Sequence, residues 1–65
     1  MEYEINVSKW NDRRKLYEYY FRVSTTYGKL KIVYDQLKEN FPEPQYKLNA
    51  TMWEKIGRDV DVENF

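Results

Sequence analysis

Residues 16–25 read LYEYYFRVST, the densest run of aromatic and β-branched side chains in this 65-residue chain. Such side chains favour a β-strand, where they pack on a pleated, half-buried surface. A helix starting at Asp12 is the alternative, but it would place the three cations at 13–15 against the positive end of the helix dipole. We therefore expect a strand over residues 15–25.

Strict alternation divides this strand into two faces. One face is expected to carry Tyr17, Tyr19, Phe21 and Val23, and the other Leu16, Glu18, Tyr20 and Arg22. A helix that covers the first face would leave Leu16 and Tyr20 uncovered on the second.

Upstream, residues 3–7 read YEINV and alternate apolar with polar side chains. This period of two predicts a half-buried strand. The residues between the two strands are polar and charged, which is typical of a turn. We expect residues 2–10 and 15–25 to form an antiparallel hairpin.

Downstream, the apolar residues fall on one stripe of a helix. The stripe consists of Leu30, Val33, Tyr34, Leu37 and Phe41. Thr25 and Thr26 are the N-cap candidates, and Pro42 and Pro44 end the helix. Ile32 lies on the polar side, so we expect it to be exposed.

After the prolines, residues 46–53 alternate again and predict a third strand. A short helix within residues 49–57 is the alternative, capped by Asn49 and stopped by Gly57, with Trp53 and Ile56 facing inward. The acidic segment 58–65 is expected to be either a short edge strand or a frayed tail.

These elements predict one α+β domain over residues 1–65. We expect a two-layer ββαβ arrangement, in which a three-stranded, mainly antiparallel sheet carries one helix on one face.

Composition argues against catalysis, because the chain contains neither histidine nor cysteine to activate a nucleophile. Its two glycines are far apart, which excludes a glycine-rich phosphate loop. Asp59, Asp61 and Glu63 resemble a solvated acidic tail more than a calcium site. We therefore expect no enzyme activity, no cofactor and no metal.

The N-terminus has no signal-peptide pattern, and no apolar run reaches the roughly 20 residues of a membrane span. The lack of cysteine suits a reducing compartment. The sequence thus predicts a cytoplasmic protein without a membrane partner.

Twelve of the 65 residues are Phe, Trp or Tyr, which is more than so small a core can enclose. Exposed aromatic patches mark binding surfaces, and Tyr, Trp and Arg are enriched at interface hot spots. The leading hypothesis is therefore a non-enzymatic protein that binds another protein, with a virus- or mobile-element-encoded inhibitor as the expected class. The candidate contact residues are Trp10, Arg13, Arg14, Tyr20, Ile32 and Trp53. Homodimerisation through this surface and a structural role in a larger assembly are alternatives.

A second hypothesis is single-stranded RNA or DNA binding, in which tyrosines of the sheet stack on bases and a basic hairpin contacts phosphates. The candidate residues are Lys9, Trp10, Arg13, Arg14, Lys15, Tyr19, Tyr20 and Arg22. Residues 9–38 carry eight basic and three acidic side chains. The isoelectric point of about 6.2 argues against this hypothesis, since typical nucleic-acid binders are basic.

Overall fold

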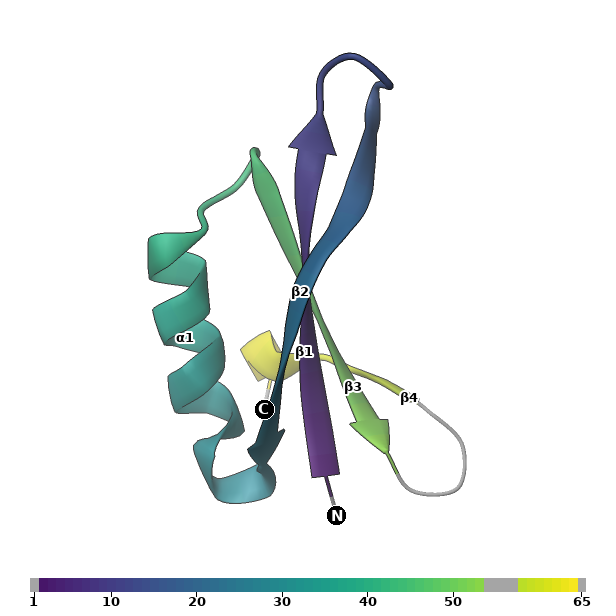
Figure 1. Cartoon of the computed structure of the whole chain (residues 1–65). Coiled ribbons are helices and arrows are strands. Elements are labelled where there is room, and N and C mark those ends of the chain that lie inside the picture. The colour runs from purple at the N-terminus through teal and green to yellow at the C-terminus, as the bar shows by residue number, and fades with distance from the viewer. Residues whose placement is uncertain (1, 54–57, 65) are drawn as a thin grey trace.

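The computed structural model describes residues 2–53 and 58–64 (Figure 1). The strands are β1 (Glu2–Asn11), β2 (Leu16–Thr26), β3 (Tyr46–Trp53) and β4 (Arg58–Val60), and the helix is α1 (Leu30–Asn40). Two short 3-10 helices, η1 (Tyr27–Lys29) and η2 (Val62–Asn64), precede α1 and follow β4. No helix in this described part is long and apolar enough to cross a membrane.

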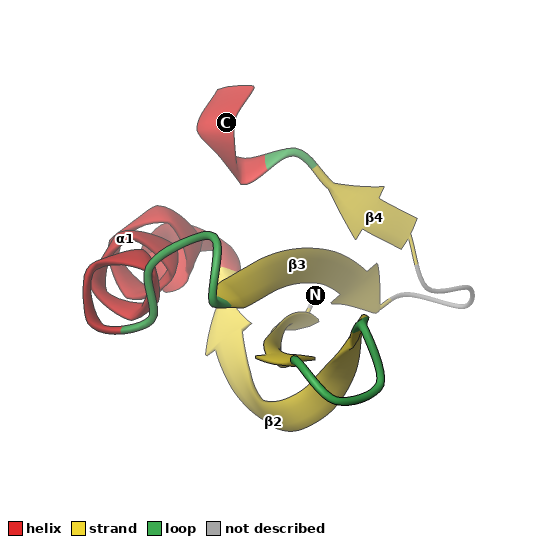
Figure 2. Cartoon of the chain, turned by 90° about the horizontal axis from the view of Figure 1, so that it is seen from above, coloured by secondary structure: helices red, strands yellow, loops and turns green. Residues whose placement is uncertain are grey.

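The four strands form one antiparallel sheet in the order β2-β1-β3-β4. The predicted α+β class, the hairpin and the helix are confirmed, and a fourth strand joins the three that were expected. Because β2 and β3 both flank β1, the chain crosses over β1 as it passes through α1. The helix therefore lies against one face of the sheet (Figure 2).

The core lies between α1 and this face, which we call the inner face. Tyr3, Ile5 and Val7 are at most 3% exposed, because every second residue of β1 points inward. Buried side chains from α1, β3 and η2 meet them: Leu30, Ala50 and Val62.

Helix α1 presents the predicted stripe to the core, where Val33, Tyr34 and Leu37 are partly buried. Ile32 is 60% exposed, as its place on the polar side predicted. The predicted N-caps are wrong. Thr25 lies within β2, and Thr26 makes no side-chain capping bond, because the chain first turns through η1.

A β-bulge in β2 overturns the predicted division of faces. Val7 pairs with Phe21 but Ser8 pairs with Tyr19, so Tyr20 is the extra residue. The bulge therefore exchanges the inward and outward positions of β2 between the residues before it and the residues after it. Tyr17 and Tyr19 therefore share the outer face with Trp10, whereas Tyr20 points to the inner face.

The segment after the third strand also packs on the sheet. Residues of β4 pair with Ala50–Met52, so the edge-strand alternative is what the structure shows for residues 58–60. The helical alternative for 49–57 is wrong for the part within β3, while Ile56 and Gly57 lie outside the described residues. Val62 is 2% exposed, and Lys38 of α1 forms an ion pair with Glu63.

This contact shifts two pKa values. Burial raises the pKa of the Tyr34 hydroxyl above its ordinary value, although the nearby Lys38 ammonium lowers it. The hydrogen bond from Lys38 to Glu63 raises the pKa of the Lys38 ammonium.

Candidate functional site

The turn of the β1–β2 hairpin extends past the end of α1 (Figure 1). Pairing of β1 with β3 stops at Lys9, whereas pairing with β2 continues to Asn11 and Leu16. We call residues 10–17, with the adjoining turn 42–45, the hairpin end. The strands extend beyond α1 at this end of the sheet (Figure 1).

Asn11 fixes the turn of the hairpin. Its side-chain Oδ1 accepts hydrogen bonds from the backbone N–H groups of Arg13 (3.0 Å) and Arg14 (3.1 Å). The backbone N–H of Lys15 donates to the carbonyl of Asn11 at 2.8 Å. Lys15 has a φ of 58°, which closes the turn in the left-handed region.

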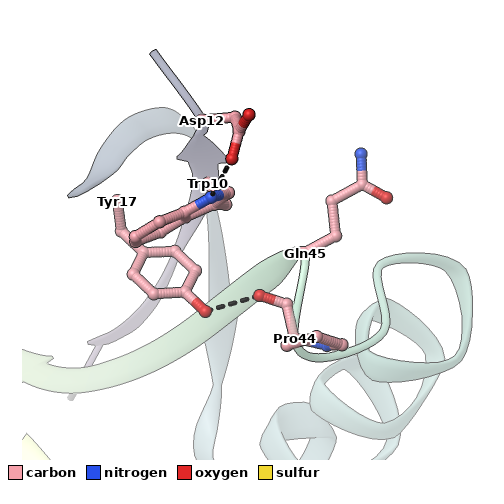
Figure 3. A pocket seen from close by; sticks show the side chains of 5 residues that line it. All are labelled: Trp10, Asp12, Tyr17, Pro44 and Gln45. Atoms are coloured by element: carbon pink, nitrogen blue, oxygen red, sulfur yellow. Dashed lines mark hydrogen bonds between the residues drawn. The ribbon is translucent and has the colours of Figure 1, made fainter. Parts of the chain in front are cut away.

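Two aromatic rings and the turn before β3 form an open pocket at this end (Figure 3). The rings of Trp10 and Tyr17 meet edge to face, with centroids 5.0 Å apart. The Tyr17 hydroxyl donates to the carbonyl of Pro44 at 2.5 Å, and the Trp10 backbone N–H donates to the carbonyl of Gln45 at 2.7 Å. With Asp12 these residues line a volume of about 570 Å³, which we call the Trp10 pocket.

The pocket owes its position to the bulge. Because the bulge turns Tyr17 to the outer face, its ring meets Trp10 and also Lys47 of β3. The Lys47 ammonium lies 4.5 Å from the centroid of the Tyr17 ring, within the range of a cation–π interaction. Tyr19, on the same face, is 65% exposed.

A second group of aromatic side chains lies at the same end of the inner face. The Phe41 ring packs edge to face on the rings of Phe21 and Tyr46, with centroids 5.1 Å apart in both pairs, and Tyr20 joins them through the bulge. Tyr20 is still 50% exposed, and the Lys9 ammonium lies 5.7 Å from its ring centroid. This group joins β2 to the end of α1.

Ion pairs neutralise much of the basic charge around the hairpin. Arg14 pairs with Glu18 at 3.0 Å, and Lys15 pairs with Asp12 at 3.2 Å. Arg13 forms no ion pair with the acidic side chains of the described residues. The cation that remains at the tip is therefore Arg13, with Lys47 beside the pocket.

The structure separates the residues predicted to contact a protein. Trp10, Arg13 and Arg14 lie together at the hairpin end, and Tyr20 lies nearby on the inner face. Ile32 is in the first turn of α1, far from the hairpin turn (Figure 1). The side chain of Trp53 lies outside the described residues.

The residues predicted to bind nucleic acid divide between the two faces. Trp10, Tyr19 and Arg22 face outward, and Lys9 and Tyr20 face inward. Arg22 pairs with Glu4 at 3.7 Å.

Sequence reasoning missed Tyr17, Pro44, Gln45 and Lys47 as parts of the site. Tyr17 was expected to face the helix, because alternation alone gives no sign of a bulge. Pro44 is 27 positions from Tyr17 along the chain, and its place beside the ring depends on the pairing of β1 with β3.

Among residues 2–53 and 58–64, no group of three acidic side chains gathers to hold a metal ion. Comparisons with protein-family models, curated proteins and solved structures give no match for this chain.

Proposed function

We propose that this chain is a non-enzymatic binding protein that acts through protein–protein contact at the Trp10 pocket. The observation that carries the proposal is the Trp10–Tyr17 ring pair, which lines an open pocket on the face that α1 leaves uncovered. An aromatic pair held by two backbone contacts is a rigid anchor that loses little entropy on binding. Trp, Tyr and Arg are also the side chains that contribute most at protein interfaces.

The charges around the pocket favour an acidic partner. Asp12 is paired with Lys15, so its charge is already balanced. Arg13 and Lys47 remain to attract carboxylates. The proposed partner surface is therefore an apolar side chain, which enters the pocket, flanked by aspartate or glutamate residues.

Such a chain acts by occupying a site on a larger protein. Inhibition of that protein is the mode of action that we propose, in line with the expected class of small inhibitors.

Single-stranded nucleic acid is negatively charged, like the proposed acidic partner. The positions of the cations over the aromatic rings nevertheless favour a protein partner. The Lys47 and Lys9 ammonium groups lie over the rings of Tyr17 and Tyr20, where stacked bases would have to bind. Tyr19 is the exposed tyrosine of the outer face that remains for stacking. Two further cations, Arg14 and Lys15, are taken up by ion pairs.

The test compares three immobilised chains in an extract of the source organism: wild type, Trp10→Ala and Ile32→Ala. Ile32→Ala is the matched control, because this exposed residue lies far from the pocket. The proposal predicts a stoichiometric protein partner that wild type and Ile32→Ala retain and that Trp10→Ala loses at least tenfold. Quantitative mass spectrometry measures the retention.

The purified partner is then titrated against a Trp53→Phe chain, in which Trp10 is the remaining tryptophan. The proposal predicts a saturable change in Trp10 emission and weaker binding by Arg13→Glu. A partner that Trp10→Ala retains fully overturns it. A labelled oligo-dT that binds at low salt, weakens steeply with added salt and shifts Trp10 emission overturns it in favour of nucleic acid.

A further inference from the structure

Strand β2 is a long, open edge of the sheet. Its 11 residues pair with β1 on one side, and no strand of the described residues pairs with its other side. The opposite edge strand, β4, has only three residues. At about 3.4 Å per residue, β2 is about as long as the molecule, whose longest axis is 37 Å.

Exposed apolar side chains lie in the first half of this strand and directly after its end. Leu16 is 41% exposed, Tyr19 65% and Tyr20 50%, and all three belong to β2. Tyr27, which directly follows the strand, is 64% exposed. An unpaired strand bordered by apolar side chains is the arrangement to which another strand adds.

The charges that usually protect an edge strand are neutralised here. Glu18 pairs with Arg14, and Arg22 pairs with Glu4 of the neighbouring strand. The bulge at Tyr20 is a second protective device, since it interrupts pairing locally. Beyond the bulge, residues 21–26 remain in a regular register with β1, and no strand of the described residues pairs with their other side.

We propose that two copies of this chain associate through residues 22–26 of β2, which pair antiparallel about a two-fold axis. A two-fold axis perpendicular to the sheet places the inner faces of the two copies on the same side of the joined sheet. The inner-face side chain of Val23 therefore meets the inner-face Thr25 of the second copy, and the polar Ser24 meets polar side chains.

We place the axis at Ser24. It sets Ser24 opposite Ser24 of the second copy and Arg22 opposite Thr26, so the two arginines stay apart. The whole chain has 11 basic and 11 acidic residues, so net charge does not drive the copies apart. The Trp10 pocket stays open in this dimer, because the pocket lies beyond the bulge; the inference thus goes beyond the proposed function.

Sedimentation velocity tests the dimer across a range of concentrations up to about 1 mM. At this concentration a dimer with a dissociation constant of about 1 mM is still detected. Wild type is expected to form dimers as the concentration rises. Ser24→Lys sets two like charges opposite each other, and is expected to raise the dissociation constant at least tenfold. Ile32→Lys adds the same charge on an exposed helix position and is expected to dimerise like wild type.

Hydrogen exchange of the backbone amides locates the interface. In residues 22–26 the amides that point away from β1 should exchange quickly in the monomer and slowly at concentrations that give the dimer. A wild-type chain that stays monomeric overturns the proposal. So does a dimer that Ser24→Lys leaves intact, or one in which these amides stay unprotected.

The two proposals fail separately. Trp10→Ala is expected to dimerise like wild type, although it loses the partner at the pocket. If Trp10→Ala abolishes the dimer while Ser24→Lys does not, the copies meet through the pocket and the β2 pairing is overturned. Slow β2 amides that appear only when a different protein is added also overturn the pairing between copies.

Discussion

The two halves of the sheet use the same kinds of side chain in opposite ways. Under α1, Tyr3 is 3% exposed and packs with Ile5 in the core. At the hairpin end, Tyr19 is 65% exposed and Trp10 is half-buried against Tyr17. The difference lies in the face that each side chain occupies: Tyr3 points to the inner face, where α1 packs, whereas Tyr19 and Trp10 point to the outer face.

The buried core and the proposed binding surface therefore lie in different places. The covered half holds all of the core residues that α1, β3 and η2 enclose. The hairpin half keeps its shape through a few hydrogen bonds and ring contacts, and several of its side chains are exposed. Substitutions in the two halves should therefore differ in their effect on unfolding.

The largest expected effect is in the covered half. Ile5 is fully buried, so Ile5→Ala should lower the free energy of unfolding by about 2–5 kcal/mol through lost burial and a residual cavity. Tyr19→Ala, in the hairpin half, should change it by no more than about 0.5 kcal/mol. Urea denaturation monitored by circular dichroism measures both. Equal effects of the two substitutions would remove the distinction between the halves.

A smaller effect is expected at the hairpin turn. Asn11→Ala removes the acceptor of two backbone N–H groups and the donor to Glu18, and should cost about 1–2 kcal/mol. Asn6→Ala on the same strand is the control and should cost less. In the nuclear magnetic resonance spectrum, amides 12–15 should move most. If Asn6→Ala costs as much as Asn11→Ala, the turn does not depend on the Asn11 side chain.

One substitution should stabilise the hairpin half. Lys15 has a positive φ, and Lys15→Gly removes the strain of its side chain, with an expected net gain of about 0.5–1 kcal/mol. Arg13→Gly, also in the turn, should instead destabilise, because glycine there only adds freedom to the unfolded chain. Thermal unfolding of both variants shows the opposite signs. A loss for Lys15→Gly contradicts the prediction.

The smallest effect concerns alkaline pH in the covered half. The pKa values of Tyr34 and Lys38 are raised in the folded state, so the unfolded chain releases these protons first as the pH rises. Their stabilising contribution is complete below the unfolded values near 10.0 and 10.5, and it is lost as the pH rises through the folded values.

Urea denaturation between pH 9 and 11, on the scale of these pKa values, measures the loss. Tyr34→Phe should show a shallower fall in stability than wild type, and Glu63→Gln should also flatten it. Identical pH profiles for wild type and Tyr34→Phe would show that Tyr34 titrates alike in both states.

Much of the covered half was predictable from the sequence. Alternation at residues 3–7 and the stripe from Leu30 to Phe41 are local patterns, and both specify which face is buried. The prolines at 42 and 44 correctly placed the end of α1. Local propensity failed at Thr25 and Thr26, because a good capping residue does not exclude a preceding 3-10 turn.

The hairpin half was less predictable, because its geometry depends on contacts between distant segments. The bulge at Tyr20 appears only in the register of β2 against β1, and it reverses the expected faces of Tyr17 and Tyr19. The place of Pro44 beside Tyr17 depends on β3. The acidic stretch 58–64 likewise gave no sign that Val62 would be buried.

The central position of β1 has a consequence for the order of folding. The first strand of the chain pairs with β2 across a short turn, but also with β3, where Glu2 lies opposite Trp53. The β1–β2 hairpin consists of local contacts and can form early. The pairing of β1 with β3 brings together residues from nearly opposite ends of the chain, so it has the larger entropic cost of loop closure. Substitutions in the β1–β2 turn should therefore slow folding, and those in β3 should mainly speed unfolding.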